Sequence, residues 1–167
     1  MSQASDHVPH EEGFFIQVEG NPAPKGSYRA LLIKGKPRLI PMSKREHKWR
    51  EQIRKACIAN GNRVPHGKAV RIVEEFYLPR PKTVKRALPT VPPDIDKLER
   101  CLHDGITDSG MWDDDSRIVS VTATKQYAEN GFTGVRFTIT WREEKWFSTR
   151  ETSATRPGKV VSGSTRN

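Results

Sequence analysis

Five aspartates stand close together in one stretch of the sequence. Asp94 and Asp96 begin a predicted helix, and Asp113, Asp114 and Asp115 come later, at the start of a predicted strand. The chain around them carries a formal net charge of +9. Carboxylates brought together repel one another and raise each other's pKa. A divalent cation bound to their oxygens and held against a phosphate backbone would relieve that repulsion, which is the chemistry of a metal-dependent nuclease.

The same aspartates also have an ordinary structural explanation. Asp94 directly follows two prolines and is a candidate N-cap, and Asp96 in the first turn is favoured by the helix dipole. Because side chains of a strand alternate between its two faces, only one of Asp114 and Asp115 can face the start of the helix. Alternation alone does not choose between them.

Length and composition limit the class of protein. The chain has 167 residues, which suits one ordinary domain. Its basic charge favours nucleic acid or another anionic surface as partner, although a coating or ribosomal protein is equally consistent with charge alone. The sequence contains no apolar run long enough for a membrane span, and its polar start does not resemble a signal peptide. Cys57 and Cys101 both fall in predicted helices and fit a reducing cytosol.

Hydrophobic periodicity predicts an α/β (α+β) fold with a small mixed sheet and two main helices, in the order β-β-β-α-β-α-β-β. The first helix begins after Ser43 and ends at Gly61, and the second covers residues 95–106. The predicted strands cover residues 14–18, 28–33, 38–40, 70–78, 116–127 and 132–141. We expect the last two strands to form a hairpin around Asn130-Gly131.

The ends and one internal loop differ from this core in composition. Residues 1–12 are predicted to be disordered, residues 13–144 to form the domain, and residues 145–167 to be a mostly disordered polar tail. The loop at residues 79–93 is rich in proline and contains four basic residues and no acid. We expect this loop to be exposed and mobile and to clamp DNA through Arg80, Lys82, Lys85 and Arg86.

Other motifs with a known chemistry are absent. The sequence has no P-loop, no Gly-x-Ser-x-Gly elbow and no His-Glu-x-x-His pair. Residues 104–115 have the length of a calcium loop, but Ser109 and Asp115 stand where an EF-hand requires Gly and Glu.

From Asp94 onward the sequence resembles the RusA family of Holliday-junction resolvases, which are common in phages and prophages. The family pattern is Asp-x-Asp-Asn-x-x-Lys, then Asp-Ala/Gly-Leu/Ile-Thr, then Gly-x-Trp-x-Asp-Asp and a hydrophobic strand. The corresponding blocks occur here without a gap at residues 94–100, 104–107 and 110–115. The order of the upstream elements is similar, so the resemblance covers roughly residues 14–141.

The resemblance implies a site, a cofactor and an assembly. It implies that Asp94, Asp96 and Asp115 bind Mg²⁺, with Mn²⁺ as an alternative, and that Asp114 supports them. It also implies a homodimer, which makes physical sense because resolving a junction needs two cuts related by the junction's symmetry. A phage or prophage protein of this kind would act in the cytoplasm of the bacterial host, in DNA recombination and repair.

Two positions depart from the family pattern. Lys97 replaces the family's Asn, and Arg100 replaces its catalytically important Lys. A guanidinium can stabilise charge on a phosphate, but it cannot act as a proton donor or base. We therefore expect Arg100 to supply charge stabilisation only, or Lys97 to take over part of the role. The alternative is an ordinary helical ion pair of Arg100 with Asp96 or Asp104.

These observations together predict a Mg²⁺-dependent endonuclease that resolves four-way DNA junctions by paired symmetric nicks. Water activated by the metal would attack the phosphodiester, and Lys125 would join the basic loop in holding backbone phosphates. Three alternatives stay open at this point: a catalytically inactive junction-binding protein, a nuclease for flaps or forks, and a basic structural protein whose acids only cap a helix.

Overall fold

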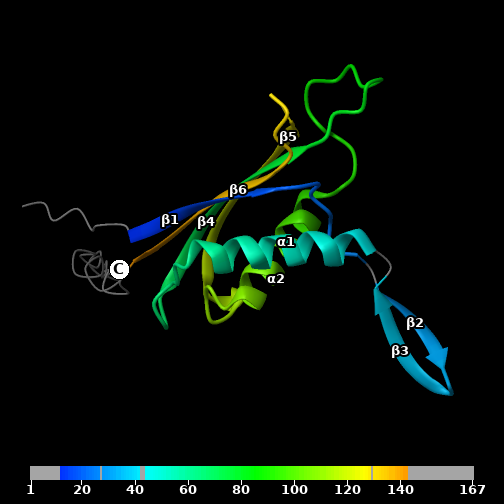
Figure 1. Cartoon of the computed structure of the whole chain (residues 1–167), viewed down its shortest axis with the longest axis horizontal. Helices are drawn as coiled ribbons and strands as arrows, with labels where there is room; N and C mark the ends of the chain where they lie inside the picture. Colours follow the sequence, from blue (N-terminus) through cyan, green and yellow to red (C-terminus); the bar gives the residue numbers. More distant parts are fainter. Residues whose placement is uncertain (1–11, 27, 42–43, 129, 143–167) are drawn as a thin grey trace, which may run out of the picture.

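The computed structural model describes residues 12–26, 28–41, 44–128 and 130–142. The elements follow one another as β1 (Glu12–Glu19), β2 (Tyr28–Ile33), β3 (Lys36–Pro41), α1 (Lys44–Asn60), β4 (Ala69–Leu78), α2 (Ile95–Ser109), the short 3₁₀ helix η1 (Asp115–Arg117), β5 (Ile118–Tyr127) and β6 (Gly134–Arg142) (Figure 1). This confirms the predicted fold class and the predicted order of helices and strands.

The main sheet has four strands in the order β1-β6-β4-β5. β4 is an inner strand of this sheet, and it pairs in parallel with β5 and antiparallel with β6. β2 and β3 form a separate two-stranded sheet that extends away from the body (Figure 1). The predicted hairpin of the last two strands is therefore wrong: β6 does not pair with β5 but lies between β1 and β4.

The core lies between this sheet and the two helices. Every second residue of β4 from Val70 to Leu78 is buried, which directs one face of the strand toward the helices. Trp49 and Ile53 of α1 and Leu98 and Leu102 of α2 are buried in the same cluster. Helical periodicity places these apolar side chains on one stripe of each helix, and burying both stripes fixes the helices on the sheet.

A glycine permits the close contact between α1 and α2. A Cβ atom at Gly105 would lie 2.8 Å from Cγ2 of Ile53 and 3.1 Å from the carbonyl oxygen of Arg50. Real Cβ atoms do not approach other atoms to 2.8 Å, so only glycine lets the helix backbones come this near. This contact holds α2 at a fixed position against α1.

Some expectations fall outside the described residues. Ser43 is one of them; the α1 glutamate predicted to form a cap with it, Glu46, accepts a hydrogen bond from the Gly26 amide at 2.7 Å. The predicted disordered ends also lie outside, except for Glu12, which begins β1. Across the ranges that the structure describes, no helix has the length and apolar character needed to cross a bilayer.

Candidate active site

The N-terminal end of α2 presents two carboxylates to solvent. Asp94 occupies the N-cap position with an extended backbone, but its side chain makes no capping hydrogen bond. It pairs instead with Lys97, whose Nζ donates to Oδ2 at 2.7 Å, and this bond lowers the pKa of Asp94. Asp96 is exposed and forms no hydrogen bond or ion pair with any described residue. Capping therefore does not explain Asp94, and Asp96 interacts with its surroundings through the helix dipole and the nearby charge of Lys97.

Lys125 connects this end of α2 to the sheet. Its Nζ donates hydrogen bonds to the carbonyl oxygens of Val91 at 3.1 Å and Pro93 at 2.8 Å. Lys125 lies in β5 opposite Phe76 of β4. These bonds fix the chain entering α2 near the C-terminal ends of β4 and β5, so Lys125 positions Asp94 in addition to any contact with DNA.

The second group of acids lies beyond the other end of α2. Asp113 accepts hydrogen bonds from Nδ1 of His66 at 2.7 Å and from the Gly67 amide at 3.3 Å, and the His66 bond is the main reason that its pKa is lowered. Asp114 caps η1 by accepting from the Ser116 amide at 2.8 Å. Hydrogen bonds from the Ser116 side chain and, second, from its amide lower the pKa of Asp114. Asp114 therefore has a structural role at this turn.

Asp115 is the first residue of η1 and is exposed. It forms no ion pair with a basic side chain among the described residues. The turn of 3₁₀ helix also means that β5 starts later than the sequence predicts. Strand alternation therefore does not extend back to the acids, and the choice between Asp114 and Asp115 cannot be made from it.

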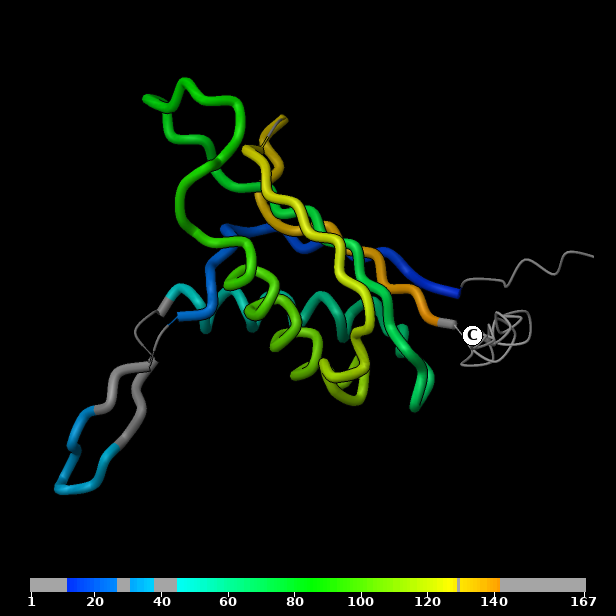
Figure 2. The backbone as a smooth tube through the Cα atoms, turned by 180° about the vertical axis from the view of Figure 1, so that it is seen from behind, coloured from blue at the N-terminus to red at the C-terminus, as the bar shows by residue number. Residues whose placement is uncertain are grey.

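Within one chain, α2 separates the two groups of acids. The helix has 15 residues, and at 1.5 Å per residue it is about 22 Å long. It runs beside β5 in the opposite direction, so Asp94 lies near the end of β5 and Asp115 precedes its start (Figure 2). In the described part of the chain, no three His, Cys, Asp or Glu side chains form a group able to hold a metal ion. A single chain therefore does not fit the three-carboxylate centre, and the metal ligands stay a prediction.

Lys97 and Arg100 differ in their surroundings. Lys97 pairs with Asp94, and this bond raises the pKa of its ammonium group. Arg100 is exposed and has no hydrogen bond or ion pair within the ranges that the structure describes, so it pairs with neither Asp96 nor Asp104. The guanidinium of Arg100 is therefore available to an anion from outside the chain.

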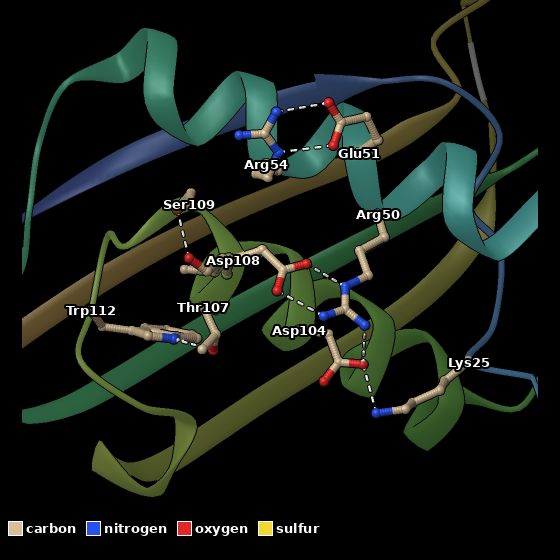
Figure 3. A network of polar contacts seen from close by, with 10 residues as sticks. Lys25, Arg50, Glu51, Arg54, Asp104, Thr107, Asp108, Ser109 and Trp112 are labelled. Atoms are coloured by element: carbon tan, nitrogen blue, oxygen red, sulfur yellow. Dashed lines mark hydrogen bonds and ion pairs between the residues drawn. The ribbon is translucent and has the colours of Figure 1, made fainter. Parts of the chain in front are cut away.

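The acids on the side of α2 that faces α1 are all paired (Figure 3). Arg50 of α1 donates to Asp108 through Nε at 2.5 Å and through Nη2 at 2.7 Å, and it reaches Asp104 at 3.4 Å. Lys25 also pairs with Asp104 at 2.6 Å. This network joins α2 to α1 and to the segment that follows β1.

The block at residues 104–107 is explained by packing. Asp104 belongs to the ion-pair network, and Gly105 permits the helix contact. Thr107 accepts a hydrogen bond from the indole nitrogen of Trp112 at 2.7 Å, which fastens the chain after α2 (Figure 3). This part of the family pattern therefore positions the acidic segments on either side of it.

A buried acid that the sequence did not predict lies beneath α2. Glu74 of β4 is fully buried, and its Oε1 lies 2.5 Å from Nε2 of His103 on α2. Glu99, one turn before His103, has a raised pKa because of its partial burial and the nearby charge of Glu74. Only the break that Glu74 makes in the apolar face of β4 could have indicated this pair from the sequence.

The basic loop is tied to the sheet at several points. The guanidinium of Arg80 lies 5.3 Å from the centre of the Tyr127 ring and donates to the carbonyl oxygen of Arg86 at 3.0 Å. Arg86 in turn donates to the Tyr127 hydroxyl at 2.9 Å. Lys82 and Lys85 are exposed, and no described residue forms an ion pair or hydrogen bond with their side chains. The loop is thus exposed as predicted but held at its base, with two lysines directed to solvent.

One comparison with known proteins gives a match. A family model with the description "Endodeoxyribonuclease RusA" matches residues 19–140, which contain α1, β4, α2 and β5 in full. A search of curated proteins found no matching protein.

Proposed function

The chain belongs to the endodeoxyribonuclease RusA family, and from this premise we propose that it is a nuclease that resolves four-way (Holliday) DNA junctions by paired symmetric nicks. Family membership is the observation that carries the proposal, because the family match covers most of the described chain. The net charge of +9 agrees with a polyanionic substrate.

The exposed acids support a hydrolytic role for the family site. Asp96 and Asp115 form no ion pair with a basic side chain of the described residues, although basic residues outnumber acidic ones in the chain. We propose Asp94, Asp96 and Asp115 as ligands for Mg²⁺ or Mn²⁺, once all three are brought together. Such an ion lowers the pKa of bound water and offsets charge at a scissile phosphate.

The basic residues around α2 would bind and orient the substrate. Arg100 can pair with a non-bridging phosphate oxygen, because nothing described within the chain uses its guanidinium. Lys82 and Lys85 would hold the backbone of a junction arm, while Arg80 and Arg86 keep the loop in place through Tyr127. Selectivity for branched DNA would then come from the shape of the junction and not from base contacts.

Cleavage of a labelled four-way junction tests this proposal. Wild-type protein should make symmetric nicks in two opposing strands when Mg²⁺ is present and none when it is chelated. Linear duplex, flap and fork substrates in the same assay measure the preference for junctions. Preferential cutting of flaps or forks would contradict the junction assignment while leaving the nuclease assignment intact.

A catalytically inactive junction-binding protein is the second candidate. Two observations favour it: Arg100 replaces the family lysine, and one chain does not bring the three acids together. Tight binding to the junction without nicks in Mg²⁺ or Mn²⁺ would establish this second function.

A further inference from the structure

We propose that a pocket walled by prolines takes up one nucleotide that branched DNA releases from its base stack. This proline pocket has a volume of about 340 Å³ and is lined by seven prolines together with Leu78, Val91, Tyr127, Asn21, Arg45 and Arg86. The inference rests on the proposed function for the choice of DNA as the ligand. It goes further in naming a binding site apart from the carboxylates and the part of the substrate that enters it.

The first observation is the place of the pocket in the fold. Glu19 at the end of β1 and Tyr77 near the end of β4 both pair with Gly134 of β6, and β5 runs parallel to β4. The carboxyl ends of β1, β4 and β5 therefore lie at one edge of the sheet, the edge at which open α/β sheets bind ligands. Pro93 belongs to the pocket wall and directly precedes Asp94, so a nucleotide held there lies beside the proposed metal ligands.

The second observation is that the walls are apolar and held in place. Proline rings have a fixed backbone φ, so a wall of prolines keeps its shape without a ligand. Lys125 binds the carbonyl oxygens of Val91 and Pro93, and Arg86 donates to the hydroxyl of Tyr127 at 2.9 Å. A preformed apolar pocket is typical of small-ligand sites, and this one is near the lower end of their range of about 300–1,000 Å³. Its size suits one nucleotide.

The third observation is the charge and polarity of the lining. Arg45 and Arg86 supply two guanidinium groups, and no acidic side chain of the described residues lines the pocket. Arg45 forms no hydrogen bond or ion pair within the described ranges, and Arg86 donates only through Nε. Guanidinium groups pair well with phosphate oxygens. The exposed Asn21 amide has both donors and an acceptor, so it can pair with the edge of any base.

A pocket of this kind would add to selection by the shape of the DNA. Taking a base out of a continuous duplex costs pairing and stacking free energy, and the cost is least where the stack is already interrupted. The branch point of a junction is such a place. Flat apolar walls accept the face of any base, so the pocket responds to the release of a base and does not read its identity.

The fluorescence of 2-aminopurine tests the pocket without any need for cleavage. This adenine analogue brightens when it leaves a base stack. Junctions that carry it at one branch-point position at a time are bound by wild-type protein with divalent metal chelated, and at one position the fluorescence should rise several-fold. No rise at any branch-point position of the bound junction overturns the inference.

Two tryptophan variants of the same loop form a matched pair. Val91 lines the pocket and is 39% exposed, so Val91→Trp should fill the pocket and abolish the rise in fluorescence. Leu88 is 61% exposed and does not line the pocket, so Leu88→Trp should keep the rise. Thermal unfolding curves show that each variant is folded. An undiminished rise with folded Val91→Trp overturns the inference.

Photocrosslinking locates the released base independently of any variant. 5-Iodouracil at the position that responds to 2-aminopurine should crosslink to Tyr127 or to the loop at residues 79–93, as mass spectrometry of the crosslinked peptide would show. A crosslink confined to another part of the chain overturns the inference.

These experiments separate the pocket from the proposed function. If wild-type protein raises the fluorescence but leaves junctions uncut in Mg²⁺, the pocket stands and the nuclease proposal fails. If it cuts junctions without any rise, the nuclease proposal stands and the pocket is wrong. Absence of junction binding overturns both.

Discussion

Four aspartates of α2 and of the turn after it form two pairs with different surroundings. Asp104 and Asp108 face α1 and are paired with Lys25 and Arg50, so their charges are used to hold the helices together. Asp96 and Asp115 are exposed and form no ion pair with a basic side chain in the described chain. Aspartate therefore stabilises helix packing at the first two positions, whereas at the other two its carboxylate has no ion pair and can bind a ligand.

Replacing one acid of each pair by Asn should give opposite results: the first variant should lose cleavage activity, and the second should lose stability. Asp96→Asn should lower junction cleavage by at least a hundredfold, because a metal ligand supports several kcal/mol of transition-state stabilisation. Its stability should fall by no more than about 0.5 kcal/mol, since Asp96 has no hydrogen bond or ion pair to lose among the described residues and interacts with the helix dipole and the nearby charge of Lys97. Cleavage rates under single turnover and thermal unfolding curves measure the two effects.

Asp108→Asn is the matched variant from the paired set. It weakens the bidentate contact with Arg50 and should cost about 1 kcal/mol of unfolding free energy, a value kept small because the pair is partly exposed. Cleavage should stay near the wild-type rate at a temperature where the fold is intact. Loss of activity in a folded Asp108→Asn protein would contradict the division.

Gly105→Val tests how strictly α1 fixes α2. The new Cβ would lie 2.8 Å from Ile53, and overpacking of this kind costs about 1–3 kcal/mol. Chemical denaturation should show the loss in the unfolding free energy. Ala59→Val on the exposed side of α1 is the control, and its effect should be within about 0.5 kcal/mol.

Arg100 and Lys97 test which cation serves the substrate. Arg100→Ala should lower cleavage about tenfold or more, because an unpaired guanidinium can stabilise charge on the phosphate. Lys97→Ala should have a smaller effect, because its ammonium is already paired with Asp94. Rates measured at saturating junction distinguish a catalytic effect from weaker binding. Full activity of both variants would remove these residues from the mechanism.

Lys82 and Lys85 test the contact of the loop with DNA. Replacing both by Ala should weaken junction binding and reduce the slope of log affinity against log salt by about 1.8, if each lysine contacts one phosphate. Lys55→Ala is the control, since Lys55 lies in α1, outside the loop, and is paired with Glu51 at 3.8 Å. A salt slope unchanged in the double variant would mean that the loop does not touch the backbone.

Glu99→Gln should have the smallest effect and a defined pH dependence. Partial burial and the nearby charge of Glu74 raise the pKa of Glu99 above 4.5 in the folded protein. Folding therefore favours the protonated form of Glu99. The stabilisation from protonated Glu99 is fully present at low pH, and it is lost as pH rises through the pKa of Glu99 in the folded state. Glu99→Gln should therefore raise stability at pH 7 by less than about 1 kcal/mol and flatten that part of the pH profile.

Local patterns were sufficient to predict the helices and strands but not their neighbours. The apolar stripe of α2 and the alternation of β4 predicted both elements within a few residues of their bounds. Asn130-Gly131 correctly marked a reversal of the chain, since both have a positive φ. A turn does not determine which strand the following segment pairs with. Because β5 occupies one edge of β4, β6 pairs with the other edge of β4, and its own second edge pairs with β1.

The candidate site shows the same limit. Residue spacing and the family pattern singled out Asp94, Asp96 and Asp115, but spacing along a chain does not show that a 15-residue helix keeps two of these acids away from the third. The ion pairs of Asp104 and Asp108 and the buried contact of Glu74 with His103 depend on helix packing, which no local pattern encodes.

The central claim is that acids at opposite ends of α2 act on one ion. Titration of the protein with Mn²⁺, followed by calorimetry, tests this most directly. The account predicts that Asp96→Asn and Asp115→Asn each lower the affinity at least tenfold, while Asp108→Asn binds as wild type does. Binding by Asp115→Asn equal to that of wild type would contradict it, because the ion would then depend on the N-terminal end of α2 alone.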